Sequence, residues 1–255
     1  MIKFGAFADV HYAKNFINGN RNCDLSLARL KNIANDFNKR SLNFCVCLGD
    51  IINSVRDYDK DSLNIQSVAA EFRNFNMPSH ILLGNHDLES MSKSDFYTRF
   101  NKEINNSYYS FSCENSKFIM LDANYLKDNS DYCSGNYKWD ESYVCKEQLI
   151  WLKTQLNTCN ETNIVIFTHQ NLDHRMNNGE IDACLVKNYK EVTKILENSK
   201  KRITVIQGHY HDGYYQVIND ITYITIKALC VGDDTSYISR IIVTIDDDLS
   251  IEYLE

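Results

Sequence analysis

The 255-residue sequence is poor in proline and glycine and lacks long apolar runs. It holds one proline, Pro78, and nine dispersed glycines, so no Pro/Gly/Ser-rich linker divides it and no solenoid repeat is evident. No run of about 18 apolar residues occurs, which excludes a membrane-spanning helix. The N-terminus lacks the apolar length of a secretory signal and reaches a carboxylate, Asp9, early. We therefore expect one domain over residues 1–255, located in the cytoplasm.

Basic residues are outnumbered, with 27 lysines and arginines against 34 acidic residues and a net charge of -7. An acidic surface repels nucleic-acid backbones and anionic lipid, so neither a nucleic-acid duplex nor a membrane is an expected partner. A small phosphorylated substrate stays possible, because bound metal reverses the local potential. The nine cysteines form no CxxC pair and are interpreted as reduced thiols. The sequence gives no indication of oligomeric state.

Apolar strands alternate with amphipathic helices along most of the sequence, and strands dominate its end. Helices are expected at 24–40, with Asp24 as N-cap, and at 61–75, 145–158 and 186–198. Strands are expected at 2–8, 43–48, 79–83, 163–167 and 203–206, with a hairpin at 107–113 and 117–122 and final strands at 214–218, 221–227, 238–245 and 249–254. This order indicates the α/β class.

Five of the apolar strands end in aspartate, asparagine or histidine. The clusters are Asp9-Val10-His11, Gly49-Asp50, Gly84-Asn85-His86-Asp87, Thr168-His169 and Gly208-His209-Tyr210-His211. They contain five of the seven histidines. Since open α/β sheets bind ligands beyond the carboxyl ends of their strands, we expect these side chains to converge on one site.

The residue types in these clusters suit metal chemistry. Asp, Asn and His are ligands for Mn, Fe or Zn, and an extended Asp-x-His or His-x-His pair turns both side chains to one side. A carboxylate can bridge two ions about 3.5–4 Å apart, and such a pair supplies a hydroxide nucleophile at neutral pH. The pattern therefore predicts a dinuclear centre for phosphoryl chemistry, with the metal left open among Mn, Fe and Zn.

The ordered clusters, which span residues 9–211, resemble the calcineurin-like metallophosphoesterase superfamily. The resemblance implies a four-layer α/β/β/α sandwich with two mixed β-sheets and two divalent or trivalent metal ions at the strand ends. It implies that the first metal is bound by Asp9, His11 and His211. It further implies that Asp50 bridges the metals and that the second is bound by Asn85, His169 and His209.

Finer motifs resemble one branch, the manganese-dependent ADP-ribose/CDP-alcohol diphosphatases, although its animal members have Gln where this chain has His11. The motifs are Glu147-Gln148-Leu149-Ile150-Trp151-Leu152, Asn188-Tyr189 and Gly208-His209-Tyr210-His211-Asp212-Gly213-Tyr214. They imply hydrolysis of a small nucleotide-like phosphodiester or pyrophosphate by a metal-bridging hydroxide, with Mn favoured. Leu83 disfavours a protein Ser/Thr phosphatase, which carries Arg there. The alternatives are a cyclic-nucleotide phosphodiesterase, a broad phosphomonoesterase and a non-enzymatic metal-bound scaffold.

The remaining site residues concern catalysis and substrate binding. His86 matches the family histidine that contacts the phosphoryl group and is proposed to protonate the leaving oxygen, with Asn85 beside it. Asp87 is expected either to orient His86 through a carboxylate–imidazole hydrogen bond or to cap the following segment. Loop insertions near 124–143 and 170–185 would form the pocket rim, where Arg175 would pair with a distal phosphate or be solvated. Stacking of a nucleobase, or packing of the loop itself, is expected of Tyr125, Tyr132, Tyr137, Trp139 and Tyr143.

Overall fold

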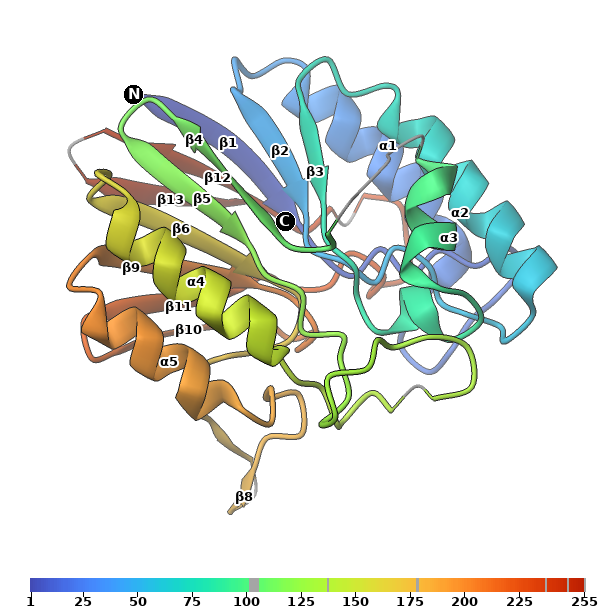
Figure 1. The fold of residues 1–255 in the computed structure, drawn as a ribbon. Coiled ribbons are helices and arrows are strands. Elements are labelled where there is room, and N and C mark those ends of the chain that lie inside the picture. The colour runs from blue at the N-terminus through green and yellow to red at the C-terminus, as the bar shows by residue number, and fades with distance from the viewer. Residues whose placement is uncertain (101–105, 137, 178, 237, 247, 255) are drawn as a thin grey trace.

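In the computed structural model, which describes all residues except 101–105, 137, 178, 237, 247 and 255, two mixed β-sheets face each other (Figure 1). The first sheet has the strand order β13 (Leu249–Leu254), β12 (Arg240–Ile245), β1 (Ile2–Phe7), β2 (Phe44–Cys47) and β3 (Ser79–Ile81). The second has the order β10 (Tyr214–Ile218), β11 (Ile221–Thr225), β9 (Arg202–Gln207), β6 (Asn163–Thr168), β5 (Ser116–Met120) and β4 (Tyr109–Cys113).

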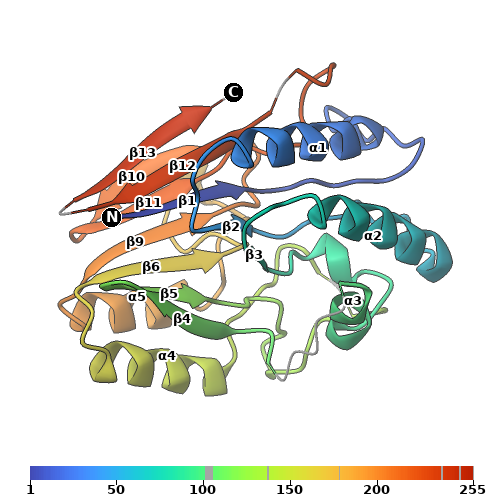
Figure 2. The same ribbon diagram turned by 90° about the horizontal axis from the view of Figure 1, so that it is seen from above.

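Helices cover the outer face of each sheet (Figure 2). On the first sheet lie α1 (Ser26–Phe37) and α2 (Tyr58–Phe72), with the short α3 (Lys93–Arg99) packed beside α2. On the second lie α4 (Lys146–Thr158) and α5 (Tyr189–Asn198). The four-layer α/β/β/α sandwich expected from the sequence is confirmed.

Three apolar cores hold the four layers together. The middle core lies between the sheets, where Phe4 stacks on Phe44 at a centroid distance of 4.9 Å and meets Phe118 and Phe167 edge-on. The two outer cores join the first sheet to α1 and α2, and the second sheet to α4 and α5. Because both faces of the central parallel strands are buried, these strands read in sequence as continuous apolar runs.

Side chains along β1 point alternately to the two faces of the first sheet. Phe4 and Ala6 point into the middle core, whereas Phe7 faces the helices. At Gly5 an added Cβ would lie 2.4 Å from the ring of Phe37, so glycine lets α1 approach β1 closely. All nine cysteines are free thiols, and five of them are buried, as the sequence interpretation expects.

Several element boundaries differ from the sequence expectations. α1 begins at Ser26 after a 3-10 turn at Cys23–Leu25, and Asp24 accepts a hydrogen bond from the Asn15 N–H instead of capping the helix. α2 begins three residues earlier than expected, because Asp57 caps it by accepting from the N–H of Lys60. α3 was not expected, although its Ser92-x-x-Asp95 capping box is visible in the sequence.

The parallel pairings decide where the strand ends lie. β1, β2 and β3 run parallel, as do β5, β6, β9 and β11. Both sets end at the same side of the sandwich, beside the 124–143 and 170–185 segments. The second segment carries a small hairpin of β7 (Met176–Asn177) and β8 (Glu180–Ile181). Among the described residues, no helix has the length and apolar character needed to cross a membrane.

Candidate metal centre

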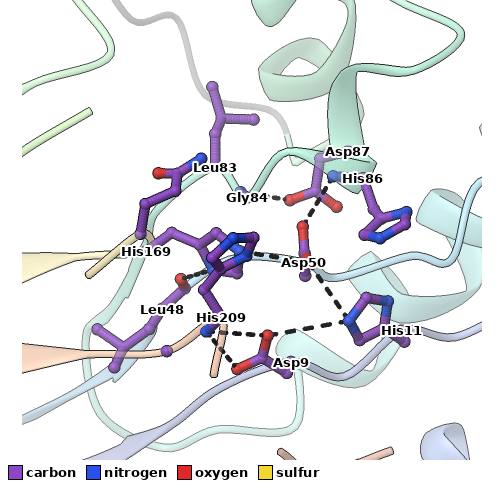
Figure 3. A network of polar contacts seen from close by, with 12 residues as sticks. Asp9, His11, Leu48, Asp50, Leu83, Gly84, His86, Asp87, His169 and His209 are labelled. Atoms are coloured by element: carbon purple, nitrogen blue, oxygen red, sulfur yellow. Dashed lines mark hydrogen bonds and ion pairs between the residues drawn. The ribbon is translucent and has the colours of Figure 1, made fainter. Parts of the chain in front are cut away.

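The predicted ligands lie together where the parallel strands of both sheets end (Figure 3). Asp9 follows β1 and Asp50 follows β2, whereas His169 and His209 follow β6 and β9 of the other sheet. Asn85 comes from the turn after β3. Asp9, Asp50, Asn85 and His169 are each at most 1% exposed. The two sheets therefore bring distant parts of the sequence to one buried polar cluster.

The backbone at this cluster is strained. The φ angle is 56° at Asp9, 46° at His11, 48° at Asp50 and 68° at His209, all in the left-handed region. Each such residue costs on the order of 1–3 kcal/mol and persists only where its surroundings hold it. At Gly84 an added Cβ would lie 2.1 Å from Asp50 Oδ1, so only glycine lets this turn approach the carboxylate.

The first group of predicted ligands consists of Asp9, His11 and His211. The Nε2 atoms of His11 and His211 face each other at 3.2 Å. Asp9 Oδ1 lies 3.5 Å from His211 Nε2 and 3.8 Å from His11 Nε2. The closely spaced lone pairs and negative charge make this a suitable position for a cation.

The second group of predicted ligands consists of Asn85, His169 and His209, and Asp50 lies near residues of both groups. Asp50 Oδ2 lies 3.2 Å from His169 Nε2 and 3.3 Å from His11 Nε2. The ligand atoms of Asp50, His169 and His209 all lie within 4.8 Å of one another. The His169 Nδ1–H donates to the Leu48 carbonyl at 2.8 Å, which leaves Nε2 as the ring atom that could bind a metal. Asp50 thus has the position of a bridging carboxylate.

The protonation states of the cluster suit divalent cations. Burial lowers the pKa of His11 and of His209 well below the ordinary value, which keeps both rings neutral. The Nε2 atom of His209 is buried and makes no hydrogen bond to the described residues. Burial opposes the protonation of His169, but the charge of Asp50 raises its pKa to about 9. A cation beside Asp50 would take the place of that proton, so these residues fit metal ions.

His86 contacts a different carboxylate from the one expected. Its Nδ1 lies 2.6 Å from Oε1 of Glu89, whose side chain is 5% exposed. Asp87 instead accepts hydrogen bonds from three backbone N–H groups at 2.8–3.1 Å. The expectation that Asp87 orients His86 is therefore wrong. The 3-10 turn at His86–Leu88 directs Asp87 into the protein, and Glu89, one turn later, reaches the ring.

Arg175 is buried in the 170–185 segment and is not on the cavity lining. Its Nη2 donates to Asn171 Oδ1 at 2.7 Å and lies 3.5 Å from Asp182. Its Nε lies 3.8 Å from Asp173, and the guanidinium stacks on the Tyr210 ring at 4.1 Å. The expected contact with a distal phosphate is corrected accordingly, because these neighbours hold the guanidinium inside the segment.

A cavity of about 830 Å³ opens over the ligands. Trp139 lines it at 46% exposure, with its ring centroid 6.3 Å from that of His209. Tyr125 and Tyr132 are buried and pack the 124–143 segment, while Tyr137 lies outside the described residues. Of the aromatic residues expected at the rim and described here, Trp139 is the one on the cavity lining.

Three residues near the centre were not predicted from the sequence. Arg21 lines the cavity, and its Nη1 lies 3.4 Å from His86 Nε2. Glu89 stands three residues after His86, a spacing that brings side chains together on a helical turn. The Cys230 thiol joins the ligand atoms of His11 and His211 within 4.8 Å. No sequence signal marks Cys230, because its segment lies far from both histidines along the chain.

The sequence of this chain is similar to those of known proteins. Residues 2–213 match the family described as calcineurin-like phosphoesterase. A manganese-dependent ADP-ribose/CDP-alcohol diphosphatase of Oryza sativa subsp. japonica is 27% identical over 85% of this chain and 79% of its own length. The Homo sapiens protein of the same name is 24% identical over 84% of this chain and 78% of its own length.

The fold is also shared with solved structures. A dimetal phosphatase from Danio rerio superposes with a TM-score of 0.83 at 20% identity, covering 99% of this chain and 95% of that one. The match over residues 2–213 covers most of the chain. The chain therefore belongs to the calcineurin-like phosphoesterase family and is a metal-dependent phosphoester hydrolase.

Proposed function

We propose that this protein hydrolyses a small nucleotide-like diphosphate or phosphodiester, of the ADP-ribose or CDP-alcohol type, with manganese at both metal sites. The observation that carries the proposal is the position of Asp50, whose Oδ2 lies between His11 Nε2 at 3.3 Å and His169 Nε2 at 3.2 Å. One carboxylate is thereby available to two cations beneath a cavity of about 830 Å³, a volume suited to a small organic substrate.

The residues of the chain divide the chemistry between them. When bound, the cations would supply an activated water and neutralise charge on the phosphoryl oxygens. His86 would donate a proton to the leaving oxygen, while Glu89 holds its Nδ1–H. Burial lowers the pKa of His86, as does Arg21, but the charges of Asp50 and Glu89 outweigh both, and the pKa is raised overall. Asn85 and His86 would also contact the phosphoryl group.

The metal identity rests on the ligands and on the relatives. Carboxylate, amide and imidazole ligands accept Mn, Fe or Zn, so they do not select one ion alone. The similarity to proteins named as manganese-dependent favours Mn. The Cys230 thiol lies beside His11 and His211. A thiol is a softer ligand than the carboxylate oxygens that Mn prefers. Reconstitution with each ion therefore belongs to the test.

The test is a substrate screen of the manganese-loaded protein over ADP-ribose, CDP-choline, cyclic AMP and simple aryl phosphates. We expect the highest kcat/KM with ADP-ribose or CDP-choline. Preference for cyclic AMP would instead identify a cyclic-nucleotide phosphodiesterase, and similar rates on all monoesters a broad phosphomonoesterase. Parallel loading with Fe and Zn shows which ion gives the greatest turnover.

A further inference from the structure

Arg21 occupies an unusual place beside the metal centre. It lines the cavity together with Asn85 and His86. Its Nη1 lies 3.4 Å from the Nε2 atom of His86, on the opposite edge of the ring from Glu89. A guanidinium is always charged and carries only hydrogen-bond donors. Arg21 therefore places a fixed positive charge next to the histidine that would face the substrate.

The side-chain partners of Arg21 differ from those of a neighbouring arginine. Arg56, which lines the same cavity, pairs with Glu89 at 2.9 Å. Within the described part of the chain, no carboxylate makes an ion pair with the Arg21 guanidinium, which instead contacts the His86 ring. Because arginine recognises phosphate oxygens through charge-assisted hydrogen bonds, a substrate phosphate would supply the missing acceptor.

The backbone holds Arg21 in a fixed position relative to the centre. Arg21 and Asn18 exchange two backbone hydrogen bonds of 3.0 Å across a tight turn. The next residue, Asn22, donates to the Cys230 carbonyl at 2.8 Å, and Cys230 N–H donates to the Asp9 carbonyl at 3.1 Å. The turn is thus tied to the strand end that carries a metal ligand. A residue positioned in this way is suited to bind a group of fixed geometry.

We infer that Arg21 binds a non-bridging oxygen of the phosphoryl group that is attacked, in a clamp with His86. The inference rests on the proposed function. Both side chains line the same cavity, and Arg21 Nη1 lies 3.4 Å from His86 Nε2, so an anionic oxygen bound by the Arg21 N–H groups lies beside the His86 ring. The position beside His86, which itself donates its backbone N–H to Asp50 at 2.8 Å, assigns the contact to the reacting phosphate and not to a distal one.

The test uses the manganese-loaded full chain and inorganic phosphate as the probe. We expect Arg21→Ala to weaken phosphate binding, measured by calorimetry, by about 10- to 100-fold, as is usual for a lost charge-assisted hydrogen bond. Arg21→Lys should recover part of this affinity, because it keeps the charge. Metal content and melting temperature should stay as in the wild type. Arg73→Ala, an exposed arginine at the end of α2, is the matched control and should bind phosphate normally.

Turnover separates the reacting phosphate from a distal one. For the reacting phosphate, Arg21→Ala lowers kcat/KM by a similar factor on an aryl phosphate and on a diphosphate. Unchanged phosphate binding, or a loss confined to diphosphate substrates, would overturn the inference. Arg21-dependent phosphate binding in a protein that hydrolyses none of the screened esters would uphold the inference and refute the proposed function. Normal hydrolysis and normal phosphate binding in both Arg21 variants would refute the inference and leave the proposed function standing.

Discussion

Replacing Asp50 with asparagine is the most informative single change at the metal centre. Asp50 Oδ2 lies 3.3 Å from His11 Nε2 and 3.2 Å from His169 Nε2, and Oδ1 accepts from the His86 N–H at 2.8 Å. Asparagine keeps the shape but removes the charge that both cations would share. Breaking a buried charge pair costs about 3–5 kcal/mol, which is roughly two to four powers of ten in a binding constant.

We therefore expect Asp50→Asn to weaken manganese binding by about 100-fold or more, with a parallel loss of activity. Calorimetric manganese titration and hydrolysis of bis(p-nitrophenyl) phosphate measure the two effects, and circular dichroism checks the fold. Asp59→Asn, which removes the same charge from an exposed position on α2, should behave as the wild type. Manganese affinity and turnover equal to the wild type in Asp50→Asn would refute the bridging role.

Three further predictions separate the roles of the surrounding residues. His86→Ala should keep both metals and lose about 10²–10⁴-fold in kcat, whereas His209→Ala should lose metal, as measured by plasma mass spectrometry. Glu89→Gln should lower kcat about tenfold at unchanged metal content. For the chelated protein, the raised pKa of His169, about 9 against 6.5 when unfolded, adds stability that is present below pH 6.5 and lost as the pH rises through 9. Its melting temperature should fall over that range, and manganese should remove the effect.

The fold could be predicted from the sequence where local pattern and packing agree. The strands β1, β2 and β6 are short apolar runs in the sequence and are buried along nearly their whole length, so their type follows from the sequence pattern. The first residues of the helices were harder to predict. Asp24 precedes α1 and Asp57 precedes α2, and both are suited to cap a helix, but tertiary contacts decide whether each one does. Asp24 is drawn to the Asn15 N–H, while Asp57 caps α2.

The convergence of the predicted ligands could be foreseen because they follow strand ends, and parallel strands end at a common edge. The partner of His86 could not be chosen in this way. Asp87 and Glu89 both follow it closely, and the direction of a 3-10 turn decides which carboxylate reaches the ring. The position of the Arg175 side chain likewise depends on its contacts with Asp182 and Tyr210, and no local sequence pattern reveals that these residues lie nearby.

Anomalous diffraction from crystals of the manganese-loaded protein tests the dinuclear centre most directly. We expect two manganese peaks on either side of Asp50, one among Asp9, His11 and His211 and the other among Asn85, His169 and His209. A single peak, or peaks remote from Asp50, would contradict the assignment of the strand-end cluster as a two-metal site.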